Sequence, residues 1–136
     1  CLLRRQRQMC IRDRYMTKKQ KQNHPIPDSI KIGYVDYQFD FWPDTFASTE
    51  EAQGEFFATH GKIGLKSSAL ESVHGTNTVL HEILHAIVYQ YGLVETLGDK
   101  EEIVVNTMAN GLSTVFVDNP WFIDYIKKYQ NIGQSE

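Results

Sequence analysis

The sequence lacks any apolar run of about 18 residues, the length that a membrane-spanning helix requires. It is also poor in cysteine, because Cys1 and Cys10 are its only two, so the rest of the chain offers no thiol for a disulfide or a cysteine-based zinc site. These absences predict no membrane partner and fit a reducing cytoplasm. The length of 136 residues, with 41% hydrophobic and 23% charged, predicts one compact domain.

Positive charge is scarce beyond the first 15 residues, which contain all five arginines. The run from Met9 to Arg14 resembles a translated sequencing adapter, so we expect residues 1–15 to be non-native and residues 16–29 to be a flexible lead-in. The alternative is a basic arm that binds nucleic acid or membrane. Residues 16–136 carry 9 basic and 16 acidic side chains, and this acidic balance argues against a nucleic-acid partner.

Two regions of the sequence predict β-structure. Residues Ile30 to Trp42 alternate apolar and polar with a phase slip near Gly33, which predicts a strand with a bulge. Residues 55–58 and 62–66 flank a short glycine-containing turn and predict a hairpin. Because lysines flank its second strand, we expect that strand to be half-exposed or at an edge. The prediction is an antiparallel sheet of about three strands.

Helices follow in the second half of the chain. Apolar residues spaced by three and four predict a helix from Thr78 to Tyr91, after a polar connector. Asp99 is a suitable N-cap for a second helix that runs to about Val117. A last short helix is expected at residues 121–129. Strands followed by helices indicate an α+β domain, which we place at residues 30–130.

The first long helix contains the motif His81-Glu82-Ile83-Leu84-His85. Residues four apart share a helix face, so His81 and His85 can converge on one zinc ion. Glu82 would accept a proton from a zinc-held water rather than bind the metal. The alternative is an amphipathic helix whose two histidines are incidental.

A catalytic zinc site requires a third protein ligand. No third histidine follows at close spacing, so we expect a glutamate from the start of the second helix, either Glu102 or Glu101. The alternative for Glu102 is a capping box with Asp99. His74, just before the first helix, would line the cleft or lie in a solvated loop.

These two helices resemble the ImmA/IrrE-type metallopeptidases and related small bacteriophage proteins. Their second helix has a pattern like E-x-x-A-x-x-F-A, and Glu102, Val105, Met108 and Ala109 occupy its positions here, with valine for alanine and methionine for phenylalanine. The resemblance implies a zincin-like fold and a cytoplasmic location in a bacterial host. It also implies Zn²⁺ held by His81, His85 and Glu102, with Glu82 as the general base.

The reaction predicted from this motif is hydrolysis of a bond in a peptide or protein substrate. The strand at residues 62–66 would pair with an extended substrate if it were the sheet edge nearest the cleft. The rival hypothesis is a non-catalytic protein of phage or mobile-element origin, in which zinc serves stability and partner binding. The sequence predicts neither the cleavage specificity nor the oligomeric state.

Overall fold

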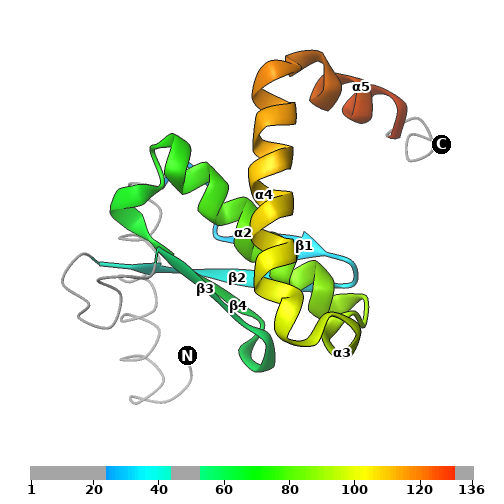
Figure 1. Cartoon of the computed structure of the whole chain (residues 1–136). Coiled ribbons are helices and arrows are strands. Elements are labelled where there is room, and N and C mark those ends of the chain that lie inside the picture. The colour runs from blue at the N-terminus through cyan, green and yellow to red at the C-terminus, as the bar shows by residue number, and fades with distance from the viewer. Residues whose placement is uncertain (1–23, 44–52, 131–136) are drawn as a thin grey trace, which may run out of the picture.

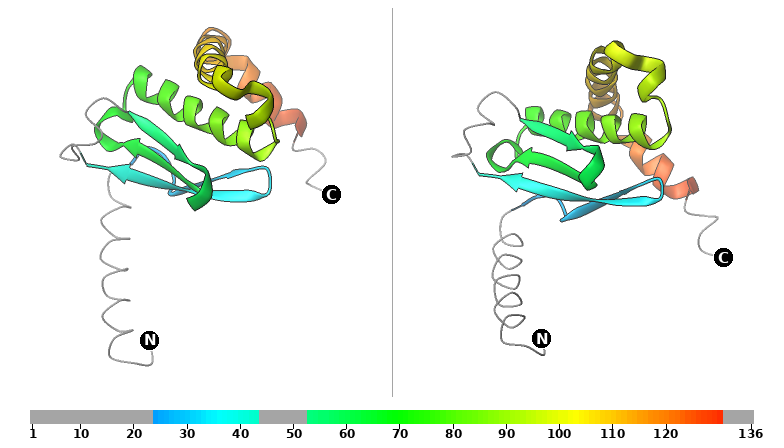
Figure 2. Two further views of the ribbon diagram at one scale, coloured as in Figure 1. Left: turned by 60° about the horizontal axis from the view of Figure 1, so that its bottom comes forward. Right: turned by 90° about the horizontal axis from the view of Figure 1, so that it is seen from below.

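The computed structural model describes residues 24–43 and 53–130 as a small α+β domain. The expected non-native segment, residues 1–15, and most of the expected lead-in lie outside these residues. A sheet, the helix α2 (Val73–Gln90) and the helix α4 (Glu101–Asp118) succeed one another as three layers. Figure 1 shows α4 crossing α2, and Figure 2 shows α2 lying along one face of the sheet.

The sheet contains four strands in the order β1-β2-β4-β3. The β2–β4 pair is parallel, whereas β1–β2 and β3–β4 are antiparallel. The sheet therefore has one strand more than the three or so predicted, and it is mixed rather than wholly antiparallel. The strands are β1 (Ser29–Ile32), β2 (Val35–Trp42), β3 (Gly54–Phe57) and β4 (Lys62–Lys66).

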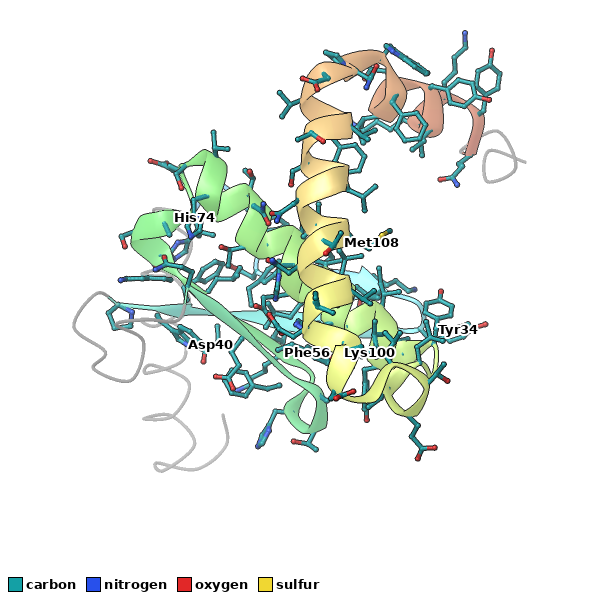
Figure 3. The ribbon with its side chains drawn as sticks, in the orientation of Figure 1. Tyr34, Asp40, Phe56, His74, Lys100 and Met108 are labelled. Carbon is teal, nitrogen blue, oxygen red and sulfur yellow. The ribbon has the colours of Figure 1, made fainter. Side chains whose placement is uncertain are left out.

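The phase slip at Gly33 is a hairpin turn and not a bulge. Ile32 pairs with Val35, so Gly33 and Tyr34 form a two-residue loop between two separate strands. Gly33 has φ of 60°, a conformation that glycine adopts without the steric cost of a side chain. Tyr34 at the tip is 95% exposed, and Figure 3 shows it pointing away from the domain.

Strand β4 lies inside the sheet, so the expectation of an edge strand was wrong. It pairs with β2 on one side and β3 on the other, and Ile63, Gly64 and Leu65 are all buried. The flanking lysines remain accessible because they lie at the two ends of the strand. The edge on this side of the sheet is β3.

The long helices match the predicted ones, with different starting points. Helix α2 begins five residues before Thr78, because the Ser72 side chain accepts a hydrogen bond from the Gly75 backbone N–H at 2.9 Å and caps the helix. Lys100, not Asp99, occupies the N-cap position of α4, with no side-chain cap bond. The remaining elements are α3 (Val94–Leu97), α5 (Pro120–Gln130) and 3₁₀ turns at residues 58–60, 67–69 and 98–100.

The main core fills the space between the sheet and α2. Tyr37 on β2 is fully buried there and donates a hydrogen bond from its hydroxyl to the Gln90 side chain at 2.8 Å. The buried residues of this core are Ile32, Tyr37, Phe39, Ile63, Leu65, Leu70 and Ala86.

Helix α4 packs on α2, and the small Ala109 is fully buried, as close approach of the two helices requires. None of the described helices is long and apolar enough to cross a membrane.

Candidate metal centre

Helix α2 places the two histidines of the motif side by side. The ring centroids of His81 and His85 lie 4.8 Å apart, and their Nε2 atoms are 3.1 Å apart. This proximity follows from their spacing, because four residues correspond to just over one helical turn. Both side chains are mostly buried, with 17% of the His81 side chain and 13% of the His85 side chain exposed.

Glu102 reaches this pair from the first turn of α4. Its Oε1 lies 3.0 Å from Nε2 of His81, and its Oε2 lies 3.0 Å from Nε2 of His85. Potential ligand atoms of the three residues all lie within 4.8 Å of one another. For comparison, ligand atoms around a tetrahedral zinc ion are separated by about 3.3 Å, given bonds of about 2.0–2.1 Å. The three side chains therefore have the spacing of a metal-binding set.

Glu101 contacts the opposite side of the His85 ring. Its Oε2 lies 2.7 Å from Nδ1 of His85. A carboxylate accepts hydrogen bonds, so this contact places a proton on Nδ1, and in the neutral ring it leaves a lone pair on Nε2. The two adjacent glutamates thus act differently: Glu102 faces the converging nitrogens, whereas Glu101 orients one of the rings from behind. The sequence left their roles open.

Desolvation lowers the pKa of His81 below its usual value of 6.5, which favours the neutral ring that a metal ligand requires. The nearby Glu102 carboxylate opposes this effect, and His85 reinforces it. Nε2 of a neutral His81 can present a lone pair toward Glu102 and His85.

Glu82 is the one buried charged residue of the described chain, with 6% of its surface exposed. Burial raises its pKa from 4.5 to about 7. The nearby His85 and a hydrogen bond from the Phe56 backbone act in the opposite direction, whereas the carboxylates of Glu102 and Glu55 add to the increase. Sequence reasoning placed Glu82 beside the metal site but missed its burial, because the burial depends on how β3 lies against α2.

The space beside Glu82 requires glycine at position 54. A Cβ atom there would lie 2.9 Å from Cγ2 of Thr78 and 3.2 Å from Cγ of Glu82. Both distances are shorter than ordinary contacts between carbon atoms. Gly54 thus allows β3 to approach α2 at the level of the motif.

These elements enclose a cleft of about 370 Å³. Figure 3 labels Phe56 on β3 close to the first turn of α4, at one side of this space. The lining includes four glutamates and no lysine or arginine, so its electrostatic potential favours a cation. The lining residues are Gly54, Glu55, Phe56, His81, Glu82, His85, Glu101 and Glu102.

The structure therefore brings together all four residues that the sequence singled out. Glu102 is directed at the two histidines, and the capping box with Asp99 is not formed. His74 lies on α2 rather than in a connector, and it lines a second hollow beyond His81.

Comparison with protein-family models, with curated proteins and with solved structures found no match.

Proposed function

We infer that the chain is a zinc-dependent peptidase of the zincin-like type, with His81, His85 and Glu102 as the metal ligands. The observation that carries this inference is the convergence of three lone-pair donors on one point. Glu101 directs a lone pair of His85 toward Nε2 of His81 and the Glu102 carboxylate. Converging lone pairs repel one another unless a proton or a cation lies among them.

The donor set favours zinc. Two imidazole nitrogens and one carboxylate form the ligand set of several zinc hydrolases, with one position left for water or substrate. Glu101 behind His85 matches the outer carboxylate that commonly orients a zinc-binding histidine. Zinc bound in such a site polarises a carbonyl group and lowers the pKa of water.

Glu82 suits the role of general base. Its carboxyl group lines the cleft beside both histidines without taking part in the three-residue cluster. Its pKa near 7 gives it a basicity suited to proton transfer at neutral pH. The Phe56 backbone N–H holds the carboxylate in place while leaving its other lone pairs available.

The outer edge of β3 is a suitable place for a peptide substrate. The Lys66 backbone N–H donates a hydrogen bond of 2.9 Å to the Gln53 carbonyl oxygen, so the backbone of Gln53 faces β4. Successive residues of a strand direct their N–H and C=O groups to opposite sides, so those of Gly54 face the open edge. An extended peptide could hydrogen-bond there as an added strand. This role replaces the one expected of β4, whose two neighbours leave it no free edge.

The replacement Glu82→Gln tests this function. The variant should bind zinc as the unaltered protein does and should hydrolyse peptides about 10²–10⁴-fold more slowly, because a general base contributes a factor of this size. Zinc content after dialysis and turnover of a fluorogenic peptide library measure the two quantities. Glu95→Gln on α3, an exposed position outside the cleft, is the matched control.

The same experiment separates the peptidase from a non-catalytic zinc protein. Zinc retained by the unaltered protein, with no hydrolysis of any peptide in the library, would favour a zinc-stabilised interaction protein. The resemblance to the ImmA/IrrE-type family and the expected bacterial cytoplasm remain part of the proposal.

A further inference from the structure

The cleft continues past the histidines into a second hollow of about 290 Å³. Gly54, His81 and Glu82 line both spaces, so the second hollow adjoins the proposed reaction centre directly. Figure 3 labels His74, which lies at the N-terminal end of α2, next to this second hollow. The lining residues are Gln53, Gly54, His74, Asn77, Thr78, His81, Glu82, Asn106 and Asn110.

Contacts between α2 and α4 fix the direction of this extension. His85 contacts Glu102, and Asn77, eight residues earlier on α2, donates a 2.6 Å hydrogen bond to Asn110, eight residues later on α4. The two helices therefore run antiparallel, and the two contacts are separated by eight residues on each helix. Eight helical residues span about 12 Å, enough for three to four residues of an extended peptide.

The two ends of this span differ in chemistry. The hollow beyond His81 and Glu82 is lined by four carboxamides, from Gln53, Asn77, Asn106 and Asn110. The Thr78 hydroxyl and the imidazoles of His74 and His81 add further polar groups, and the lining contains no lysine, arginine or aspartate. Only the shared Glu82 is acidic.

Among residues 24–43 and 53–130, few partners use the hydrogen-bonding capacity of these carboxamides. Each carboxamide offers two donors and one acceptor oxygen. Asn77 and Asn110 use one donor and one acceptor in their mutual bond. Among the described residues, the Asn106 side chain has no hydrogen-bond partner.

We propose that this second hollow is a subsite for an uncharged, hydrogen-bonding side chain, an asparagine or glutamine, of a peptide bound beside the His81–His85–Glu102 cluster. A carboxamide both donates and accepts, so it can satisfy the unused groups of Asn106 and its neighbours. An aliphatic side chain would displace water from these groups and leave them unpaired. An acidic side chain would lie near the Glu82 carboxylate, and its charge would be desolvated without a partner.

This subsite rests on the proposed function, because it takes the zinc site as the anchor of the peptide. Its test is a binding experiment that needs no turnover. Three peptidyl hydroxamates, identical except for asparagine, leucine or lysine next to the zinc-chelating group, are titrated into the zinc-loaded full chain by calorimetry. The asparagine compound should bind at least about 10-fold more tightly than the other two, which corresponds to about 1.4 kcal/mol.

The replacement Asn106→Leu should reduce this preference to about twofold or less, with zinc content unchanged, because it removes a carboxamide that forms no hydrogen bond to any other described residue. Thr107→Leu, at the next and exposed position of α4, lies outside the lining and should leave the preference intact. If the variant at Asn106 also keeps its asparagine preference, the assigned subsite is wrong.

The remaining outcomes separate this proposal from the proposed function. Equal affinity for the three compounds, or tighter binding of the lysine compound, overturns the carboxamide subsite while leaving the zinc site in place. Preferential binding of the asparagine compound by a protein that hydrolyses no peptide supports the subsite and overturns the peptidase. A chain that retains no zinc overturns both.

Discussion

Two spaces of almost equal size lie against opposite faces of α2. The cleft of about 370 Å³ is lined mainly by histidines and glutamates. The other space, a groove of about 380 Å³, lies between the first half of α2 and the last half of α4 and has no charged lining residue. Size therefore does not distinguish them, whereas side-chain chemistry does. The groove is lined by Val73, Thr76, Val79, Leu80, Ile83, Ser113, Phe116 and Val117.

The two faces of the helix pair contribute differently to the protein. On the cleft face, polar side chains contact one another across the two helices, so their removal should alter metal binding. On the groove face, apolar side chains pack without such contacts, so their removal should alter only the free energy of unfolding. Loss of a proposed metal ligand on the cleft face is therefore expected to have the largest effect, and loss of a side chain on the groove face a smaller one.

Removing a proposed ligand should have the largest effect. His85→Ala should weaken zinc binding by more than about 100-fold, because loss of an outer partner alone costs about 10–100-fold. Competition with a fluorescent chelator measures the affinity. Ser113→Ala, in the groove on the other side of the helix pair, should bind zinc as the unaltered protein does. Equal affinity of both variants would remove the proposed distinction between the two faces.

Glu101 should have a smaller effect of the same kind. Glu101→Ala should weaken zinc binding by about 10–100-fold, because the His85 ring loses the partner that fixes its orientation. Glu101→Gln should recover part of this loss, since its amide oxygen can still accept from Nδ1. If Glu101 only stabilised the start of α4, both variants would change the melting temperature and leave the zinc affinity unaltered.

The groove face should show the reverse pattern. Phe116 is half-buried, so Phe116→Ala should lower the free energy of unfolding by about 1.5–2.5 kcal/mol, roughly half the cost for a fully buried phenylalanine. Its zinc affinity should remain within about twofold of the unaltered value. Urea denaturation measures the first quantity. Val117→Ala, at an exposed position of the same groove, is the control and should cost less than about 0.5 kcal/mol.

A further effect concerns pH and the metal-free protein. Burial raises the pKa of Glu82 from 4.5 to about 7, so the folded state binds the proton more tightly than the unfolded state does. The protonated Glu82 therefore stabilises the folded state, and this contribution is fully present below pH 4.5 and is lost as the pH rises through 7. Glu82→Gln stays neutral, so its melting temperature relative to the unaltered protein should increase between pH 5 and pH 8, by about 4 °C or more.

The lowered pKa of His81 acts in the opposite direction, since its stabilising contribution is lost as the pH falls. It is present in both proteins and largely cancels in the difference. Thr107→Leu, at an exposed position of α4 without a titratable side chain, should give a melting-temperature difference that does not vary with pH. The same flat difference for Glu82→Gln would contradict the assigned burial effect.

Local periodicity predicted the helices and the histidine pair well, because spacing along a helix fixes which side chains share a face. The resemblance supplied Glu102, whose contact with α2 spans 17 residues of sequence. Sheet order could not be obtained in this way. The parallel pairing of β2 with β4 joins distant segments, and lysines at the ends of β4 gave a false indication of an edge.

Two details of the site depend on the assembled fold. Glu82 is buried because β3 passes over it, which no pattern within α2 could indicate. Glu101 and Glu102 are consecutive, and only the position of α4 on α2 determines which carboxylate faces Nε2 and which faces Nδ1. The phase slip at Gly33 was ambiguous for a different reason, since a bulge and a two-residue turn both interrupt the alternation of side chains.

The stacking of α4 on α2, rather than on the sheet, has a consequence for the motions of the chain. Two of the proposed ligands belong to the inner helix and the third to the outer one, so a bound metal would link the two layers. The outer helix could hinge away more freely in the metal-free protein, carrying Glu102 with it. Amide hydrogen exchange in the first turns of α4 should therefore slow on metal loading, whereas exchange in β4, already held between two strands, should change little.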